Sequence, residues 1–271
     1  FLGDAETEIV DEIKSQLPSY LVAEYPSGRI ISGKNVDEGR PIASLAKLLV
    51  AFEAINQNFD ANKSTIYSVK KHSSEGNPLS LVDGEKIKNG DLLNTMLILS
   101  ANNTARMVAE ASGLSETQLV KSINERLSEW GADNTVITDV TGLDKNNIST
   151  ARDLLKIFTK VLNEPSLKTV LSKTEYSFKE LVNKNKIATH SFKTTNQIIS
   201  IPNRKYRVLA SKTGYTTAAQ STLVMLVESR TTKKQYIIVT LGNPNYSKRF
   251  EEPNRIANWI AGSDVKIANQ K

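Results

Sequence analysis

The chain has 271 residues, of which 39% are hydrophobic and 24% charged, so a folded globular protein is expected and wholesale disorder is excluded. It has no cysteine, which excludes disulfides, thiol catalysis and cysteine-ligated metal. The net charge of +6 does not predict nucleic-acid binding, because the densest basic cluster, Lys184 and Lys186 with His190 nearby, lacks interleaved aromatic residues. An anionic cell envelope suits this charge equally well.

The N-terminal part of the chain predicts a helix, a hairpin and a second helix. Residues 4–17 place apolar side chains at helical spacing, so we expect an amphipathic helix there. The short apolar runs Tyr20–Tyr25 and Arg29–Ser32 flank Pro26-Ser27-Gly28, a turn sequence typical of a hairpin. From Ser44 to about Asn56, apolar residues recur on one side and indicate the second helix.

The middle of the chain is predicted to be mainly helical. Short strands are expected around Ser64–Val69, within a polar stretch that extends to residue 90. Four helical patterns follow, at residues 91–99, 104–112, 116–130 and 151–163. Ser115 and Gln118 form a capping-box pattern at the start of the third helix. Residues 175–192 alternate in polarity and predict a hairpin.

The C-terminal part predicts strands and a closing helix. Three strands are expected, at Tyr206–Ser211, Ser221–Ser229 and Gln235–Leu241. A helix is expected over residues 254–261, and residues 263–271 are predicted to be a tail or a linker. Because the turns between the strands are short, neighbouring strands should be antiparallel.

These elements predict an α/β (α+β) fold, in which five antiparallel strands form a sheet flanked by helices, with a mostly helical lobe inserted. We expect a single domain over residues 1–271, without an additional C-terminal domain. The sheet lobe would comprise about 1–43 and 165–262, and the helical lobe about 44–164. No apolar run approaches the roughly 20 residues that span a bilayer. The first residue is Phe1 rather than Met, so a membrane anchor could lie outside the printed sequence.

Ser44-Leu45-Ala46-Lys47 is the first motif with chemical content. A serine and a lysine three residues apart share one face of a helix, so the amine can reach the hydroxyl. Lysine can act as a base only if its pKa falls by about three units, from ~10.4 toward neutrality. Burial and a nearby second cation both lower the pKa of a lysine. The start of a helix also favours negative charge that develops on the serine oxygen.

Two further motifs have the polar groups that such a serine needs. In Ser100-Ala101-Asn102, which follows the helix ending at Leu99, the serine can relay a proton and the amide can bind a substrate carbonyl. In Lys212-Thr213-Gly214, which follows the strand Tyr206–Ser211, the glycine lets a substrate backbone approach the strand edge. Each motif alone is common on ordinary helices and turns, so it is their combination and order that are specific.

The order Ser-x-x-Lys, Ser-x-Asn, Lys-Thr-Gly resembles the motif set of penicillin-binding proteins and β-lactamases. Other segments are similar to low-molecular-mass penicillin-binding proteins, the D-alanyl-D-alanine carboxypeptidases and D,D-endopeptidases. These segments are Thr141–Asp144, Ser149–Asp153, Thr195-Asn196 and Lys212–Thr216. The resemblance extends from about Ala43 to Trp259 and implies the serine β-lactamase/transpeptidase-like fold, which agrees with the elements predicted above.

The resemblance also implies roles for individual residues. Ser44 would be the nucleophile and Lys47 its base. The walls of the cleft would be formed by Ser100 and Asn102 on one side and by Lys212, Thr213 and Gly214 on the other. The backbone N–H groups of Ser44 and Tyr215 would form the oxyanion hole. Thr216 would help to hold the substrate carboxylate, with Arg249 as its cation and the neighbouring Lys248 as the rival candidate.

The implied activity is that of a serine-type D-alanyl-D-alanine carboxypeptidase, which removes the terminal D-alanine from peptidoglycan stem peptides through a Ser44 acyl-enzyme. β-Lactam antibiotics would be covalent inhibitors, and neither a metal nor another cofactor is expected. The location would be extracytoplasmic in a bacterium. The alternative within the family is a D,D-endopeptidase that cleaves peptidoglycan cross-links.

Three positions depart from related patterns. Family members usually have Ala-Gly after the third motif, where this chain has Ala219-Gln220, and Asn103 replaces a frequent aspartate. A class A β-lactamase needs a glutamate in a Glu-x-x-Leu-Asn run to activate water, but Thr159 precedes Leu162-Asn163 here. We therefore expect slow hydrolysis of β-lactams and a long-lived acyl-enzyme.

Two other classes of function have less support in the sequence. A metal hydrolase or a Ser-His-Asp enzyme is poorly supported, because His72 and His190 are the only histidines and no His-Glu-x-x-His run occurs. Both histidines are expected to be exposed or capping side chains. A non-catalytic module that binds peptidoglycan or antibiotic is disfavoured by the joint presence of Ser44, Lys47, Ser100 and Lys212.

Overall fold

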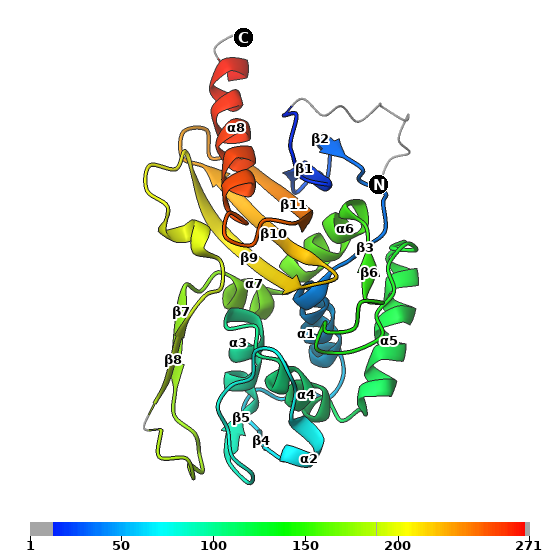
Figure 1. Ribbon diagram of the computed structural model, residues 1–271, viewed down its shortest axis with the longest axis vertical. Helices are drawn as coiled ribbons and strands as arrows, with labels where there is room; N and C mark the ends of the chain where they lie inside the picture. Colours follow the sequence, from blue (N-terminus) through cyan, green and yellow to red (C-terminus); the bar gives the residue numbers. More distant parts are fainter. Residues whose placement is uncertain (1–12, 188, 269–271) are drawn as a thin grey trace.

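The computed structural model describes residues 13–187 and 189–268, and its centre is a five-stranded antiparallel sheet (Figure 1). The strands lie in the order β2-β1-β11-β10-β9. Their bounds are β1 Ser19–Tyr25, β2 Ile30–Lys34, β9 Tyr206–Thr216, β10 Gln220–Ser229 and β11 Gln235–Asn243. Because β1 pairs with β11, the two ends of the chain build one sheet, as the sequence predicted.

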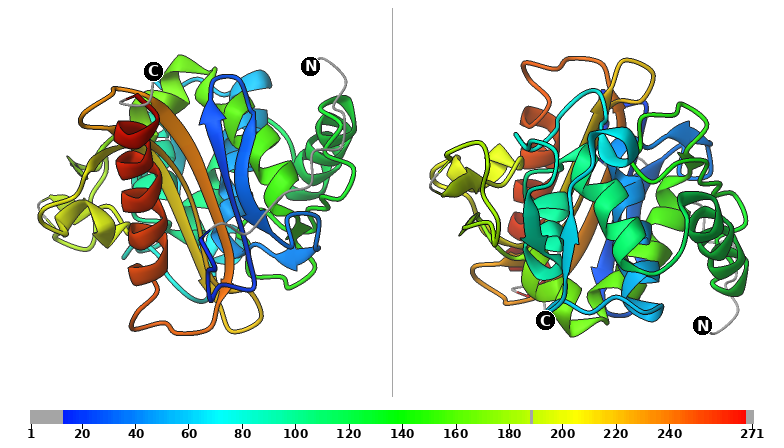
Figure 2. Two further views of the ribbon diagram at one scale, coloured as in Figure 1. Left: turned by 90° about the horizontal axis from the view of Figure 1, so that it is seen from above. Right: turned by 90° about the horizontal axis from the view of Figure 1, so that it is seen from below.

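The sheet is buried on both faces, and alternation along the strands sorts its side chains between two cores. On β11, Tyr236 and Ile238 belong to the core that includes Ile256 of α8 (Glu251–Ala268). Ile237 and Val239 belong to the opposite core, beneath the other helices. Figure 2 shows α8 along one face and the other α-helices on the opposite side of the sheet. A strand places successive side chains on opposite faces, so both sets must be apolar here.

The helical part lies between β2 and β9 in the chain. Its elements are η1 Ala43–Leu45, α1 Ala46–Asn56, α2 Val69–His72, α3 Asn89–Ile98, α4 Asn102–Ala111, α5 Glu116–Glu129, α6 Ala151–Leu162, α7 Pro165–Leu171 and η2 Gln197–Ser200. The four helices predicted between residues 91 and 163 are confirmed, as is the capping box at Ser115. The short α7 was not predicted, although Pro165 at its first turn is a typical start signal.

Three small two-stranded sheets complete the fold. They pair β3 (Arg40–Pro41) with β6 (Ile148–Ser149), β4 (Ser64–Ile66) with β5 (Lys86–Lys88), and β7 (Glu175–Phe178) with β8 (His190–Lys193). The last pair is the predicted hairpin. Its tip is tied to the helical part, because the Glu85 carboxylate accepts hydrogen bonds from the backbone N–H groups of Lys184, at 2.9 Å, and Asn185, at 2.7 Å.

The largest differences from the sequence prediction lie at the two ends of the chain and in β9. Most of the predicted helix at 4–17 lies outside the described residues, and residues 13–17 form a turn and bend rather than a helix. The closing helix α8 extends to Ala268, so the predicted tail is wrong over 263–268. Strand β9 continues past Ser211, because β10 pairs with it as far as Thr216. Among the described residues no helix has both the length and the apolar character to cross a membrane.

Candidate active site

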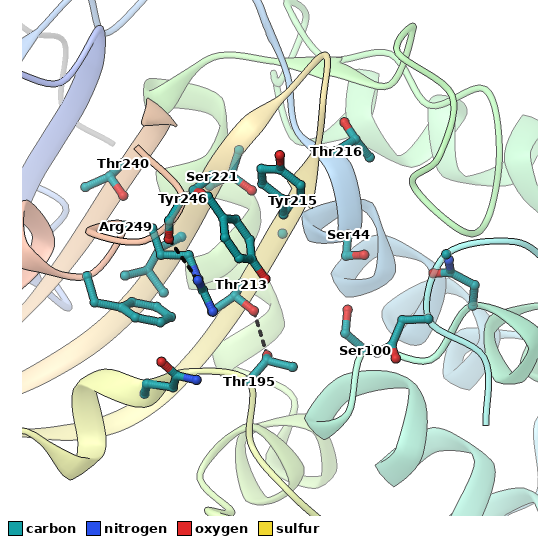
Figure 3. Close-up of a pocket in the computed structure, with 18 of the residues that line it drawn as sticks. Ser44, Ser100, Thr195, Thr213, Tyr215, Thr216, Ser221, Thr240, Tyr246 and Arg249 are labelled. Atoms are coloured by element: carbon teal, nitrogen blue, oxygen red, sulfur yellow. Dashed lines mark hydrogen bonds between the residues drawn. The ribbon is translucent and has the colours of Figure 1, made fainter. Parts of the chain in front are cut away.

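One cavity of about 520 Å³ brings together most of the residues singled out from the sequence. Ser44, Ser100, Asn102, Thr213, Gly214, Tyr215, Thr216 and Arg249 line it. Lys47 and Lys212 are buried behind its walls. Figure 3 shows Ser44 and Ser100 on one side of this cavity and Thr213 with Arg249 on the other. The helical part and β9 therefore form two walls of one cleft.

The amine of Lys47 lies at the bottom of the cleft, in contact with Ser44. Its Nζ is 2.8 Å from Ser44 Oγ and 2.7 Å from Asn102 Oδ1, and it also donates to the carbonyl of Thr141. A neutral amine has two N–H donors and one lone pair. It can therefore donate to Asn102 and Thr141 while its lone pair accepts the Ser44 proton.

Burial sets the protonation state of this amine. It lowers the pKa of Lys47 from 10.5 to about 7, against the opposing effect of the Asp139 carboxylate. Burial also lowers the pKa of Lys212 well below its ordinary value, and repulsion by the Lys47 ammonium adds to this. The cause at Lys47 is thus burial, one of the two causes expected from the sequence, and not the charge of a second cation. A neutral Lys47 is available near neutral pH.

Lys212 joins the two walls of the cleft. Its Nζ donates to Ser100 Oγ at 2.7 Å and to the carbonyl of Thr213 at 2.8 Å. The hydroxyls of Thr213 and Thr195 are 2.6 Å apart, which connects β9 to the segment after the β7–β8 hairpin (Figure 3). On the opposite wall, Asn102 Nδ2 donates to the carbonyl of Glu75 at 2.8 Å, which turns its Oδ1 toward Lys47.

Gly214 lets β9 approach Ser44 closely. A Cβ atom at this position would lie 2.9 Å from the backbone nitrogen of Ser44 and 2.6 Å from Thr222 Oγ1. Such contacts are too short, so a larger residue would push the strand away from Ser44. This close approach is what the predicted oxyanion hole needs, because it brings the backbone around Tyr215 to that of Ser44.

Arg249 rather than Lys248 lies at the cleft. The Arg249 guanidinium donates to the carbonyl of Tyr246 at 2.9 Å, and its central carbon is 3.9 Å from the centre of the Tyr246 ring. Tyr246 in turn makes an edge-on contact with Tyr215, with ring centres 4.4 Å apart. This contact between Tyr246 and the Arg249 guanidinium was not predicted from the sequence. Lys248 does not line the cavity, and its amine is 3.9 Å from a carboxylate oxygen of Glu251.

The departures from related patterns have structural explanations. Asn103 is buried, and its amide both accepts from the Leu79 N–H, at 2.9 Å, and donates to the Leu79 carbonyl, at 2.8 Å. Gln220 starts β10 with a φ of 57°, in the left-handed region that favours glycine, and it does not line the cavity. Thr159 also lies outside the cavity lining, with its hydroxyl bonded to the Leu155 carbonyl.

The two histidines lie away from the cleft, and both are buried, so the expectation of exposed side chains is wrong. His72 does cap locally, because its Nδ1 accepts from the Ser68 N–H at 3.0 Å. His190 Nε2 is 2.6 Å from a carboxylate oxygen of Glu180. Over residues 13–187 and 189–268, no cluster of three or more histidine or acidic side chains could hold a metal ion.

Comparison with known proteins places this site in a family context. Residues 4–245 match the family model described as D-alanyl-D-alanine carboxypeptidase. The chain is 27% identical to a D-alanyl-D-alanine endopeptidase of Pseudomonas aeruginosa, over 91% of this chain and 78% of the relative. It is 26% identical to a D-alanyl-D-alanine carboxypeptidase of Mycobacterium tuberculosis, over 76% of this chain and 68% of the relative.

Solved structures have the same fold. A D-alanyl-D-alanine carboxypeptidase of Mycobacterium tuberculosis superposes with a TM-score of 0.80 at 21% identity, covering 97% of this chain and 96% of that one. A Streptomyces DD-transpeptidase superposes with a TM-score of 0.78 at 20% identity, covering 92% and 97%. The sheet and the helical part of this chain therefore form an arrangement already known from other proteins.

Proposed function

Because the chain belongs to the D-alanyl-D-alanine carboxypeptidase family, we propose that it removes the terminal D-alanine from peptidoglycan stem peptides through an acyl-enzyme on Ser44. The observation that supports this most directly is the contact of 2.8 Å between Lys47 Nζ and Ser44 Oγ. With a pKa of about 7, this lysine is available as a base at the pH where most enzymes work. One catalytic domain carries all of these residues.

Acylation begins when the Ser44 hydroxyl gives its proton to the neutral amine of Lys47. The Ser44 oxygen then forms a bond to the carbonyl carbon of the penultimate D-alanine. The negative charge on the carbonyl oxygen is stabilised by the backbone N–H groups of Ser44 and Tyr215. As the C–N bond breaks, the departing nitrogen takes up the proton that Lys47 received, with Ser100 and its partner Lys212 as the relay, so that Lys47 is neutral again when free D-alanine leaves.

Hydrolysis of the ester completes the cycle. Water adds to the acyl carbon and gives a proton to the neutral amine of Lys47. The bond to Ser44 then breaks, Lys47 returns that proton to Ser44 Oγ, and the shortened peptide leaves as its acid. A β-lactam reacts at the same serine by opening of its ring amide, but its leaving nitrogen stays attached to the acyl group. Because Thr159 offers no carboxylate to activate water, we propose that this second ester is long-lived.

The test of this function is the product of a defined substrate. We expect the enzyme to release one D-alanine from a muropeptide with a pentapeptide stem, with the mass loss of a single alanine residue in the product. A cross-linked dimer of the same composition should be cleaved more slowly. Cleavage of the dimer alone, with the pentapeptide untouched, would assign the chain to the endopeptidase alternative.

That alternative has an observation in its favour. The chain is also 27% identical to a D-alanyl-D-alanine endopeptidase of Haemophilus influenzae and 26% identical to one of Escherichia coli, covering 77% and 78% of these relatives. Both reactions break a D-alanyl amide bond through the same serine chemistry. They differ in whether a free terminal carboxylate must be recognised, and this depends on the groups at the Arg249 end of the cleft.

Arg249→Ala should lower kcat/KM for release of terminal D-alanine by roughly 10- to 100-fold, the effect of losing a charge-assisted hydrogen bond. The reason is that the guanidinium lines the cavity, where it can pair with a free carboxylate. Kinetics on a pentapeptide and on its C-terminally amidated analogue would measure this, and the amidated peptide should lose much less.

Lys248→Ala is the matched control, since it removes a neighbouring cation that does not line the cavity. It should leave both rates unchanged. Equal losses on the two peptides in Arg249→Ala, or no loss on either, would remove Arg249 from carboxylate recognition and strengthen the endopeptidase alternative.

The location follows from the substrate. Peptidoglycan lies outside the cytoplasmic membrane, so we propose that the enzyme acts there, and that the net charge of +6 favours association with the anionic envelope. Nucleic acid is not a partner in this proposal. β-Lactams are expected as covalent inhibitors and stem peptides as substrates.

A further inference from the structure

A carboxylate outside the three motifs organises the loop that contacts both Ser44 and Lys47. Asp139 lies in the segment between α5 and β6. Its two oxygens accept four hydrogen bonds. The donors are the Thr141 N–H, at 3.1 Å, the Thr141 hydroxyl, the Gly142 N–H, at 3.0 Å, and Asn147 Nδ2. Each carboxylate oxygen therefore already accepts two hydrogen bonds, and the group is not placed to take a proton from a substrate.

The residues held by Asp139 touch the reacting pair. The carbonyl of Thr141 accepts a hydrogen bond from Lys47 Nζ. Gly142 has a φ of 82°, and a Cβ there would lie 2.3 Å from the Ala43 carbonyl oxygen and 2.9 Å from the Ser44 nitrogen. One short turn thus positions an acceptor for the base and supports the backbone of the nucleophile.

The other end of the loop is fixed through Asn147, which is fully buried. Its Oδ1 accepts from the Thr138 N–H at 2.9 Å, while its backbone carbonyl accepts from the Ile42 N–H at 2.9 Å. Ile42 immediately precedes the turn that carries Ser44. Asp139 is therefore linked to the catalytic serine in two ways, through the backbone of Gly142 and through Asn147 and Ile42.

We propose that Asp139 is a positioning residue for acylation, whose ionised carboxylate holds the Thr141 carbonyl on Lys47 and the Gly142 backbone against Ser44. This inference rests on the proposed function, because it assumes that Lys47 is the base. An ionised carboxylate suits this position because all four of its partners are donors. A neutral amide would turn its own N–H groups toward some of these donors and leave them unpaired.

The charges around the pair determine what the loss of Asp139 would do. Burial acts to raise the Asp139 pKa, but hydrogen bonds from Thr141 and Asn147 outweigh it and hold the pKa below its ordinary value. Lys212 faces Lys47 from β9, and Glu116 of α5 lies close enough to Asp139 that their charges repel. Asp139 itself acts to raise the Lys47 pKa. Removing its charge should therefore lower that pKa further.

The experiment is the pH dependence of acylation by a fluorescent penicillin in Asp139→Asn. We expect the maximal rate to fall roughly 10- to 100-fold, as expected for a lost charge-assisted hydrogen bond, and the acid limb of the profile to move to lower pH. A purely structural loss would lower the rate without moving the limb. Asp144→Asn is the matched control, because it makes the same change at an exposed position in the same loop, and it should behave as wild type.

Asp139→Glu tests the geometry separately, because it keeps the charge but displaces it by one methylene. It should be slower than wild type with its acid limb unmoved, and it decides the question if Asp139→Asn does not fold. A wild-type rate in Asp139→Glu, or an unmoved limb in a folded Asp139→Asn, would overturn the proposal. Failure of the wild-type protein itself to be acylated would instead refute the proposed function.

Discussion

Ser44→Ala is expected to abolish covalent labelling by a fluorescent penicillin, because the ester needs the Ser44 oxygen and alanine has none. The variant should remain folded. The serine hydroxyl is one of three partners of Lys47, and the other two, Asn102 and Thr141, are unaffected by the change. Labelling would be followed on a denaturing gel, and the melting temperature would confirm the fold.

Ser100→Ala provides the contrast that separates a nucleophile from a supporting hydroxyl. Ser100 accepts from Lys212 at 2.7 Å and lines the same cavity, so its loss should slow labelling but leave the final amount near one per molecule. Stable labelling of Ser44→Ala would show that another residue is acylated. If neither variant is labelled, Ser100 is as necessary for acylation as Ser44. That result would contradict the assignment of Ser100 as a supporting group.

The architecture of the sheet could be predicted because its signals are local. Short apolar runs mark the strands, and short turns such as the one between β10 and β11 imply antiparallel partners. The prediction ended β9 at Ser211, since Lys212 and Gly214 are poor strand formers. Pairing with β10 extends the strand to Thr216 and overrides that preference. Tertiary contacts of this kind cannot be read from a window of sequence.

The ends of the chain show the same limit. Ile13 and Leu17 have helical spacing, yet both are buried in the α8-side core from a non-helical segment. Their apolar character was a sign of burial rather than of a helix. At the other end, α8 continues through Ser263–Ala268, although the prediction ended this helix at Ala261.

The candidate site was predictable where short spacing along consecutive helical turns brings groups together, as for Ser44 in η1 and Lys47 in the first turn of α1. The supporting groups could not be found in this way, because they lie far away in sequence. The Thr141 carbonyl reaches Lys47 from 94 positions away. Asp139, which holds that carbonyl, and Tyr246, which supports Arg249, had no recognised motif of their own.

The pKa of Lys47 is likewise a property of the fold. The motif predicts only that the base is a lysine. Burial of its amine in the folded protein lowers the pKa to about 7, so that the neutral form is present near neutral pH. Its two fixed acceptors, Asn102 Oδ1 and the Thr141 carbonyl, also restrict the direction of its lone pair. The chemistry of the site therefore depends on packing as much as on the three motifs.

The rate of acylation in the wild-type protein should rise with pH through a pKa of about 7, because only the neutral amine of Lys47 can accept the Ser44 proton. Below that pKa the neutral fraction falls tenfold per pH unit, so acylation at pH 5 should be roughly 100-fold slower than at the plateau. Lys47→Arg should lose acylation at every pH in this range, since the guanidinium stays protonated. Stopped-flow or quenched labelling with penicillin would measure these rates.

Chemical rescue can show that the amine, rather than the length or charge of the side chain, is what matters. The chain has no cysteine, so Lys47→Cys introduces a single thiol that can be alkylated in the unfolded protein to a lysine-length side chain ending in an amine. Unmodified Lys47→Cys should be inactive, and the refolded aminoethylated protein should recover acylation with an acid limb of its own. Near wild-type acylation by Lys47→Arg, or a wild-type rate that does not change between pH 5 and 8, would exclude Lys47 as the base. The proton of Ser44 would then have to go elsewhere, with Lys212 through Ser100 as the nearest amine to test.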